Sequence, residues 1–314
     1  MIEKILPTRL YELLDRNNIC TSKQIMLLSP WEIKKLTNIS EDDTKLIKNL
    51  VSQNLQPQLL TCGKLITFKT LKDRVSTGCN RIDSILNGGF RKGTITEIYG
   101  ESGSGKTQIA LQSIVHNWAK GGVYICTEDI FPVKRYEQIK KNIPSYNSSV
   151  DYGQNIFIEH IVEMDELFSS VRVRLPKLLS QKKITLVVID SVAAPFRVDS
   201  TNYIQRADQL KQFANTLINI AQKNNIAILC INQVTSNFGE SSEVIPSLGL
   251  AWSNMICTRL WMKKTSSTYC FSENKGNNEV RNVNIRELSV EFSPDVTNSV
   301  VKLIITSSGI HAVQ

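Results

Sequence analysis

The chain has 314 residues, of which 41% are hydrophobic, and it carries a formal charge of +8. This length suits one α/β core with a small second domain, and no run approaches the roughly 20 apolar residues of a membrane span or forms the apolar segment of a signal peptide. Seven scattered cysteines and three histidines without metal-ligand spacing argue against disulfides and a zinc site, so we expect a soluble protein inside the cell.

Residues 1–56 contain no strand-like run and are predicted to form a small all-α N-terminal domain. Segment 30–51 resembles a helix-hairpin-helix module, in which Ser40 would cap the second helix. Such modules usually bring glycine backbone close to a DNA phosphate, whereas this turn reads Thr37-Asn38-Ile39-Ser40. Eight basic and seven acidic side chains up to residue 60 leave the domain nearly neutral. We therefore favour a protein contact or a structural role over a DNA contact.

Residues 57–74 are predicted to be a linker, and residues 75–314 the main domain. In the main domain, short apolar runs typical of buried strands alternate with helical patterns; the runs cover 94–99, 123–126, 156–158, 184–189 and 226–231. From Met255 onward the pattern changes to short strands joined by loops. The sequence therefore predicts an α/β fold with a mainly parallel central sheet flanked by helices and a C-terminal antiparallel extension.

A phosphate-binding loop is predicted directly after the first of these runs. Gly100-Glu101-Ser102-Gly103-Ser104-Gly105-Lys106-Thr107 fits the Walker A pattern G-x-x-x-x-G-K-[ST] at every fixed position, and Gln108 follows it. Glycines let successive backbone N–H groups and the helix N-terminus point at a triphosphate. Lys106 would reach the β- and γ-phosphates, and the Thr107 hydroxyl would ligate Mg²⁺. The chain is therefore predicted to bind a nucleoside triphosphate.

A second nucleotide element follows the apolar run that ends at Ile189. Asp190 stands where the Walker B aspartate would hold the Mg²⁺ shell. An aspartate at the end of an apolar strand also commonly caps the next helix. Its pairing with a complete Walker A loop favours the metal role.

Several segments together resemble the RecA-type recombinase family and its eukaryotic paralogue branch. The resemblance extends over most of residues 70–310, and the segments that carry it are Val75–Gly89, Tyr124–Pro132, Ile156–His160, Leu186–Arg197 and Cys230–Thr235. The resemblance implies a RecA-like P-loop ATPase core with ATP and Mg²⁺ as cofactors. It further implies a nuclear subunit, with the cytoplasm as an alternative, that supports homologous recombination, double-strand-break repair and Holliday-junction or fork processing.

The resemblance also implies roles for three residues outside the two Walker elements. Glu128 would orient the attacking water, and Gln233 would sense the γ-phosphate and pass its state to a DNA-binding loop. Arg135 stands where family members stack an arginine on the adenine. The alternatives are that Gln233 satisfies backbone groups at a strand end and that Arg135 is a solvated helix charge.

The sequence departs from the strand-exchange members of the family in both presumed DNA loops. Segment 198–208 lacks glycine and has one arginine against two aspartates, while segment 235–249 has two acids and no base. Phosphate affinity needs lysine or arginine, so both loops are predicted to be weak DNA contacts on their own. Efficient strand exchange by the chain alone is therefore not expected.

A subunit contact is predicted in the linker. Filament-forming relatives carry a Phe-x-x-Ala hook there, and the corresponding residues are Leu59-Leu60-Thr61-Cys62; an ordinary linker is the alternative. The implied partners are the C-type recombinase paralogue, the main strand-exchange recombinase and single-stranded or branched DNA. Three functions follow: a weak DNA-stimulated ATPase, an assembly subunit with ATP as a structural ligand and, least favoured, a RecA-core ring helicase.

Overall fold

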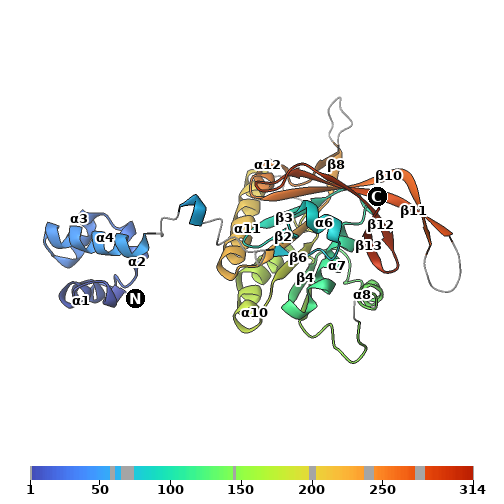
Figure 1. The fold of residues 1–314 in the computed structure, drawn as a ribbon. Helices are drawn as coiled ribbons and strands as arrows, with labels where there is room; N and C mark the ends of the chain where they lie inside the picture. Colours follow the sequence, from blue (N-terminus) through green and yellow to red (C-terminus); the bar gives the residue numbers. More distant parts are fainter. Residues whose placement is uncertain are drawn as a thin grey trace. The chain divides into compact units, whose positions relative to one another are not determined.

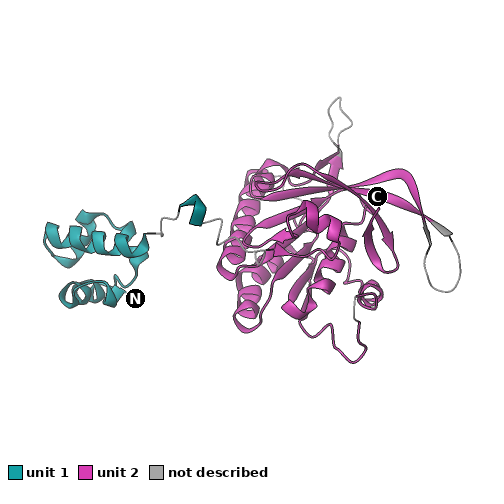
Figure 2. Ribbon diagram, viewed as in Figure 1, with its two compact units in different colours: residues 1–69 teal, residues 70–314 magenta. Residues whose placement is uncertain are grey.

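A computed structural model describes residues 2–56, 61–64, 74–143, 146–197, 203–236, 244–272 and 280–313. The chain divides into two compact units, residues 1–69 and residues 70–314 (Figure 2). Leu59 and Leu60 of the predicted hook, and parts of both presumed DNA loops, lie outside the described residues. Within the described part of the chain, no helix combines the length and the apolar character needed to cross a membrane.

In the described residues of the first unit the regular structure is helical, with no strand. A short 3-10 turn precedes four helices: η1 (Ile2–Lys4), α1 (Thr8–Arg16), α2 (Ser22–Leu27), α3 (Pro30–Thr37) and α4 (Glu41–Leu55). Side chains from all of these elements form one apolar cluster, in which Leu14, Ile25, Ile33, Ile47 and Val51 are fully buried. The predicted cap on α4 is confirmed, because the Ser40 hydroxyl accepts a hydrogen bond of 3.0 Å from the Asp43 backbone N–H.

The turn between α3 and α4 contains no glycine, and Asn38 takes the left-handed position at the end of α3. Asn38 adopts the left-handed conformation at φ 54°, which asparagine tolerates better than most residues, and its N–H donates to the Lys34 carbonyl at 2.8 Å. The first turn of α4 carries three acids, Glu41, Asp42 and Asp43. Carboxylates at the N-terminus of a helix interact favourably with the helix dipole, but they repel a phosphate that approaches the same N–H groups. This charge pattern supports the expectation that the unit is a poor DNA contact.

The second unit is built on a nine-stranded sheet with the order β13-β12-β11-β10-β3-β7-β6-β4-β5 (Figure 1). The parallel part comprises β3 (Ile95–Tyr99), β4 (Gly122–Cys126), β5 (Ile156–His160), β6 (Leu186–Asp190) and β7 (Ala227–Asn232). The C-terminal strands, antiparallel to one another, are β10 (Thr258–Ser272), β11 (Val280–Phe292), β12 (Val300–Thr306) and β13 (Gly309–Ala312). These pairings confirm the predicted parallel sheet with an antiparallel extension. The two parts are joined where β10 pairs parallel to β3.

Helices cover both faces of the sheet. One face packs against α6 (Asn80–Ile85), α7 (Lys106–His116) and α8 (Val133–Lys140). The other packs against α9 (Met164–Ser169), the π-helical segment η4 (Ser170–Arg174), α10 (Leu175–Gln181), α11 (Tyr203–Asn224) and α12 (Gly249–Ser253). Along β4, Val123 and Ile125 join the second cluster while Tyr124 and Cys126 join the first, as the two-residue period of a strand requires.

Four short strands and one 3-10 turn lie outside these layers. They are β1 (Arg74–Val75), β2 (Phe90–Arg91), η3 (Trp118–Lys120), β8 (Val234–Ser236) and β9 (Val244–Pro246). The β8–β9 pair is an antiparallel hairpin that begins where β7 ends. Most of this hairpin therefore lies within the second presumed DNA loop, residues 235–249. The base of the hairpin lies beside the carboxyl edge of the parallel strands.

Candidate functional site

The loop Gly100–Thr107 joins β3 to α7 and is tightly packed by the C-terminal strands. A Cβ atom at Gly100 would lie 2.2 Å from the carbonyl oxygen of Met262 on β10. At Gly105, where φ is +114°, a Cβ atom would lie 2.7 Å from Cδ1 of Ile305 on β12. At Gly100 the contact is with backbone, which leaves no room for a side chain, whereas at Gly105 it is with the flexible end of Ile305 and the positive φ is the stronger constraint. The close approach of β10 therefore requires glycine at position 100, and the curl of the loop requires it at position 105.

Lys106 lies in the curl of this loop. Its side chain is buried, and Nζ donates to the carbonyls of Gly100 at 2.7 Å and Glu101 at 2.8 Å. Burial lowers the pKa of the Lys106 ammonium, although the charges of Asp190 and Glu128 act in the opposite direction. Beside it, the fully buried Ser104 hydroxyl has no hydrogen-bond partner among the described residues. A buried ammonium and an unpartnered hydroxyl in a glycine loop fit the phosphates of a nucleotide.

Thr107 and Asp190 meet across the ends of two elements. The Thr107 hydroxyl, in the first turn of α7, donates to Oδ2 of Asp190 at the end of β6, at 2.8 Å. Tyr124 on β4 donates its hydroxyl to the same oxygen at 2.7 Å. Burial raises the pKa of Asp190, and the hydrogen bonds from Tyr124 and Thr107 lower it. Hydroxyl and carboxylate oxygens are the ligands that Mg²⁺ prefers, so the pair fits the predicted metal role.

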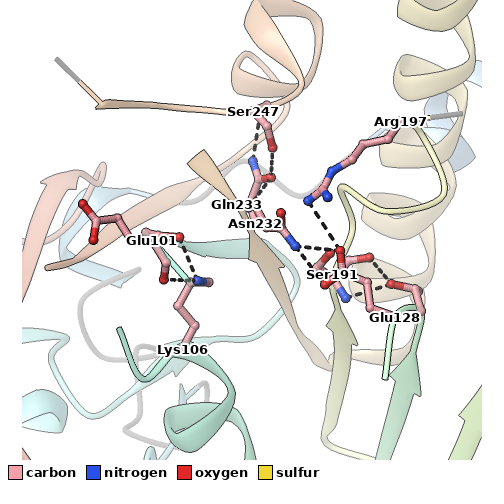
Figure 3. A network of polar contacts seen from close by, with 10 residues as sticks. Glu101, Lys106, Glu128, Ser191, Arg197, Asn232, Gln233 and Ser247 are labelled. Atoms are coloured by element: carbon pink, nitrogen blue, oxygen red, sulfur yellow. Dashed lines mark hydrogen bonds and ion pairs between the residues drawn. The ribbon is translucent and has the colours of Figure 1, made fainter. Parts of the chain in front are cut away.

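Glu128 and Gln233 also lie in direct contact (Figure 3). Gln233 Nε2, just beyond β7, donates to both carboxylate oxygens of Glu128 at 2.6 and 2.8 Å. Arg197 Nη2 lies 3.4 Å from Glu128 Oε1, and the Arg197 and Glu128 side chains are 50% and 38% exposed. The carboxylate is accessible to solvent and held from two sides. The structure thus brings the predicted catalytic pair together at the carboxyl edge of the sheet.

Arg135 lies on a different wall of the site. From α8, its guanidinium donates to Gln108 Oε1 at 2.5 Å, to the Thr306 carbonyl at 2.7 Å and to the Ser307 carbonyl at 3.0 Å. A pocket of about 400 Å³ opens here, and its lining residues are Gly103, Gly105, Lys106, Thr107, Gln108, Arg135, Ile305, Thr306 and Ser307. Arg135 therefore belongs to the same pocket as the phosphate loop and joins α8 to the turn between β12 and β13.

A smaller cavity adjoins this pocket on the metal side. Its volume is about 180 Å³, and it is lined by Thr107, Tyr124, Cys126, Glu128, Asp129, Ile130, Pro132 and Asp190. Thr107 borders both spaces. The predicted site residues that line neither space are Gly100, Glu101, Ser102, Ser104 and Gln233, and Gln233 contacts the second through Glu128. A nucleotide with its metal ion would therefore extend from the larger pocket into the smaller one.

Three features of the site escaped the sequence analysis. The Tyr124 hydroxyl bonds to Asp190, Arg197 pairs with Glu128, and residues 305–307 form one wall of the pocket. The position of Tyr124 could have been predicted from strand alternation. Residues 124 and 126 lie on the same face of β4, and both line the small cavity. No sequence signal points to the wall formed by residues 305–307, because these residues lie about 200 positions from the phosphate loop and carry no motif.

The fold and the loop define a RecA-like core. The Rad51 family model matches residues 70–313, and the chain belongs to this family. DNA repair protein XRCC3 of Bos taurus is 33% identical over 267 residues, covering 76% of this chain and 78% of that protein. XRCC3 of Mus musculus is 30% identical and covers 94% of this chain and 93% of that protein. A crystal structure of the RadB recombinase, at 24% identity, shares the fold with a TM-score of 0.60 and covers 76% of this chain and 100% of that one.

Proposed function

We propose that the chain is an ATP-binding recombinase paralogue. It acts in homologous-recombination repair of DNA double-strand breaks and in Holliday-junction and fork processing, in the nucleus, as a subunit of a paralogue complex. Family membership and the similarity to the XRCC3 proteins support the repair role. The observation that carries the nucleotide assignment is the convergence of Lys106, Thr107, Asp190, Glu128 and Gln233 at the carboxyl edge of the sheet.

The arrangement of these residues suits phosphoryl transfer, in which catalysis is mostly positioning and charge stabilisation. Mg²⁺–ATP would supply the γ-phosphoryl group and a divalent charge at the site. Lys106 would exchange its two carbonyl partners for phosphate oxygens, and Thr107 and Asp190 would hold the metal shell. Glu128 would orient a water and accept its proton, with Gln233 and Arg197 fixing the carboxylate. Arg135 would border the base, on the wall formed by residues 305–307.

Hydrolysis is expected to be weak and stimulated by DNA. The Glu128 carboxylate is the proposed base, yet both of its oxygens accept hydrogen bonds from Gln233 and one lies 3.4 Å from Arg197 Nη2. Oxygens occupied in this way are less available to a water, so turnover would rise when Gln233 moves away from them. The second candidate function is a subunit that uses ATP as a structural ligand. It is favoured by the contacts that hold the Glu128 carboxylate and by the few cations in the presumed DNA loops. No specific observation favours a ring helicase.

The exposed edge of the sheet offers a place for a partner. Among the described strands, β5 pairs only with β4, and beside it lies a pocket of about 290 Å³. Its lining residues are Val123, Phe157, Ile158, Glu159, Ser170, Arg174, Leu175 and Leu178. An extended segment can add to a free edge strand and place an apolar side chain in such a pocket. We infer that this edge accepts the linker of another recombinase subunit, as the Leu59 segment of this chain would dock on the C-type paralogue.

Leu59→Glu is expected to weaken association with the C-type paralogue by at least about tenfold. A buried apolar side chain contributes roughly 1.5–3 kcal/mol, and the new charge adds a desolvation cost. A pull-down or light-scattering titration measures the effect, with nucleotide binding as the folding control. The described, exposed Thr61 gives the matched variant Thr61→Glu, which adds the same charge at an unconstrained x position of the large-x-x-small pattern. Equal losses in both variants, or none in Leu59→Glu, would rule out the hook.

One candidate DNA contact lies between the presumed loops. A pocket of about 310 Å³ is lined by Tyr203, Arg206, Ala207, Leu210, Leu248, Gly249, Leu250 and Ala251. Tyr203 and Leu250 are largely exposed. An aromatic ring and a cation in one pocket suit a stacked base and its phosphate. The proposed weak DNA contact would therefore include Arg206.

Arg206→Gln is expected to lower single-stranded DNA affinity and to reduce the slope of log K against log salt by about 0.7, the value of one phosphate contact on a single strand. A fluorescence-anisotropy titration at several salt concentrations, with the chain in its paralogue complex, measures both quantities. Lys211→Gln is the control, because Lys211 is on the same helix and pairs at 3.9 Å with Asp208. An unchanged slope in Arg206→Gln would remove the residue from the DNA interface.

The proposed function as a whole is tested by co-purification with the C-type paralogue, followed by ATPase assays with and without DNA. The expected result is a stable complex whose slow hydrolysis rises when single-stranded or branched DNA is added. A complex that binds ATP but hydrolyses none with DNA present would favour the assembly role. Failure to bind either the paralogue or ATP would contradict both candidate functions.

A further inference from the structure

A fully buried carboxylate lies on β3, three residues before the phosphate loop begins. Glu97 Oε1 accepts hydrogen bonds of 2.7 Å from Asn232 Nδ2 and 2.7 Å from Trp252 Nε1, while Oε2 accepts one of 2.5 Å from Arg259 Nε. Trp252 and Arg259 are buried as well, and Arg259 Nη1 donates to Ser253 Oγ at 2.8 Å. One carboxylate therefore joins β3, the end of β7, helix α12 and β10.

Asn232 connects this buried cluster to Gln233 at the nucleotide side of the sheet, and its contacts with Ser247 are drawn in Figure 3. Its Nδ2 also donates to the Ser247 carbonyl at 2.9 Å, and its Oδ1 accepts from the Ser247 hydroxyl at 2.5 Å and from the Gln233 backbone N–H at 2.8 Å. The Ser247 N–H in turn donates to the Gln233 carbonyl at 2.9 Å. Asn232 thus ties Gln233 to the base of the β8–β9 hairpin, and Glu97 fixes Asn232.

Stability alone is a weak reason for such a cluster. Apolar residues of similar size are often as stabilising as a buried ion pair, because two charges lose their hydration. A fully satisfied polar cluster also fixes the relative orientation of the groups that it joins, because each hydrogen bond admits a narrow range of geometry. A shift of Asn232 relative to Glu97 would break its bond to the carboxylate or force Trp252 and Arg259 to follow. The four elements are therefore expected to move together.

We propose that Glu97 is a positioning residue that couples the nucleotide site to helix α12 through Asn232. This inference rests on the proposed nucleotide site. A shift of Gln233, whose side chain bonds to Glu128, reaches Asn232 through the Gln233 backbone N–H and Ser247 through the Gln233 carbonyl. Asn232 then carries the shift to Glu97, and the carboxylate passes it to Trp252. The base of the hairpin around the second presumed loop and the start of α12 then respond as one unit to the nucleotide.

The indole N–H of Trp252 gives a direct readout, because its hydrogen bond to Glu97 sets its ¹H–¹⁵N resonance. The chain has four tryptophans, so the spectrum of the full chain labelled at indole nitrogen holds four such signals, and Trp252→Phe assigns the one of interest. The probe is Mg²⁺ with a non-hydrolysable ATP analogue. Isothermal titration reports binding of the same analogue separately.

Two variants distinguish coupling from simple support. Asn232→Ala removes the link between the carboxylate and Gln233 while Trp252 and Arg259 stay bonded to Glu97. Ser253→Ala removes a bond from the far side of the same cluster and is the matched control. We expect the analogue to shift the Trp252 signal in the parental chain and in Ser253→Ala. In Asn232→Ala the shift is lost, with affinity for the analogue kept within about twofold, roughly 0.4 kcal/mol.

Three results overturn the inference. A full Trp252 shift in Asn232→Ala shows that the signal travels by another route, and equal losses in Asn232→Ala and Ser253→Ala show a structural cluster only. An unshifted Trp252 in the parental chain at saturating analogue also overturns it, yet leaves the nucleotide site standing because titration has shown binding. Titration without binding contradicts the proposed function itself. If Asn232→Ala does not fold, Asn232→Ser, whose shorter side chain also lacks the amide that bonds to Glu97, carries the same expectation.

Discussion

Lys106→Ala is expected to weaken binding of Mg²⁺–ATP by at least about 100-fold, roughly 2.7 kcal/mol. Lys106 is the buried cation of the phosphate loop. Hydrogen bonds from an ammonium to phosphate are charge-assisted and stronger than the neutral ones that the loop N–H groups and the Ser104 hydroxyl can offer. Isothermal titration of the full chain measures the loss.

The control for this substitution is Lys120→Ala. Lys120 is exposed in η3, so this variant removes the same charge from the same unit without touching the pocket. Its affinity for Mg²⁺–ATP should stay at the parental value. Parental affinity in Lys106→Ala, with the chain folded, would mean that the loop Gly100–Thr107 does not bind the triphosphate.

Glu128→Gln should lower the rate of hydrolysis about 10²- to 10⁴-fold while ATP affinity stays nearly unchanged. The amide keeps the shape of the side chain but cannot accept a proton. It also replaces one of the two oxygens that face Gln233 and Arg197 with an NH₂ group, so that contact should loosen. Single-turnover hydrolysis in the paralogue complex with DNA separates the chemical step from product release.

Asp129→Asn is the matched variant for that measurement. Asp129 follows Glu128, is also exposed and lines the same small cavity. If Asp129→Asn stops hydrolysis and Glu128→Gln does not, the proton acceptor is Asp129. If both variants hydrolyse ATP at the parental rate, the acid lies outside the cavity beside Asp190.

The parts of the molecule that the sequence predicts well are those with local rules. The strands around Val123, Val187 and Ile228 are apolar on both faces because helices cover both sides of the sheet, which leaves continuous hydrophobic runs. The phosphate loop is recognisable because its backbone geometry demands glycines at fixed spacing. Since parallel strands end at one edge, the groups that follow β3, β4, β6 and β7 come together without further assumption.

Other features depend on contacts between distant segments, and no local pattern shows them. Glu97 lies in an apolar strand, and its burial becomes evident only with Asn232, Trp252 and Arg259 around it. The β10 strand extends to Ser272, whereas the sequence predicts only short strands joined by loops after Met255. Its later part was not recognisable because that part has the polar composition of a loop and becomes a strand by pairing with β11. Arg135 could equally have been solvated, and only the nearby carbonyls of Thr306 and Ser307 place it in the pocket.

The most direct measurement of the central claim is equilibrium binding of ATP to the full parental chain in Mg²⁺ and in excess EDTA. Two residues, Thr107 and Asp190, are proposed to hold the metal, while Lys106 acts on the phosphates directly. The account predicts saturable binding of one ATP per chain in Mg²⁺, and weaker binding in EDTA. Absence of saturable binding in Mg²⁺ by the folded chain would contradict it.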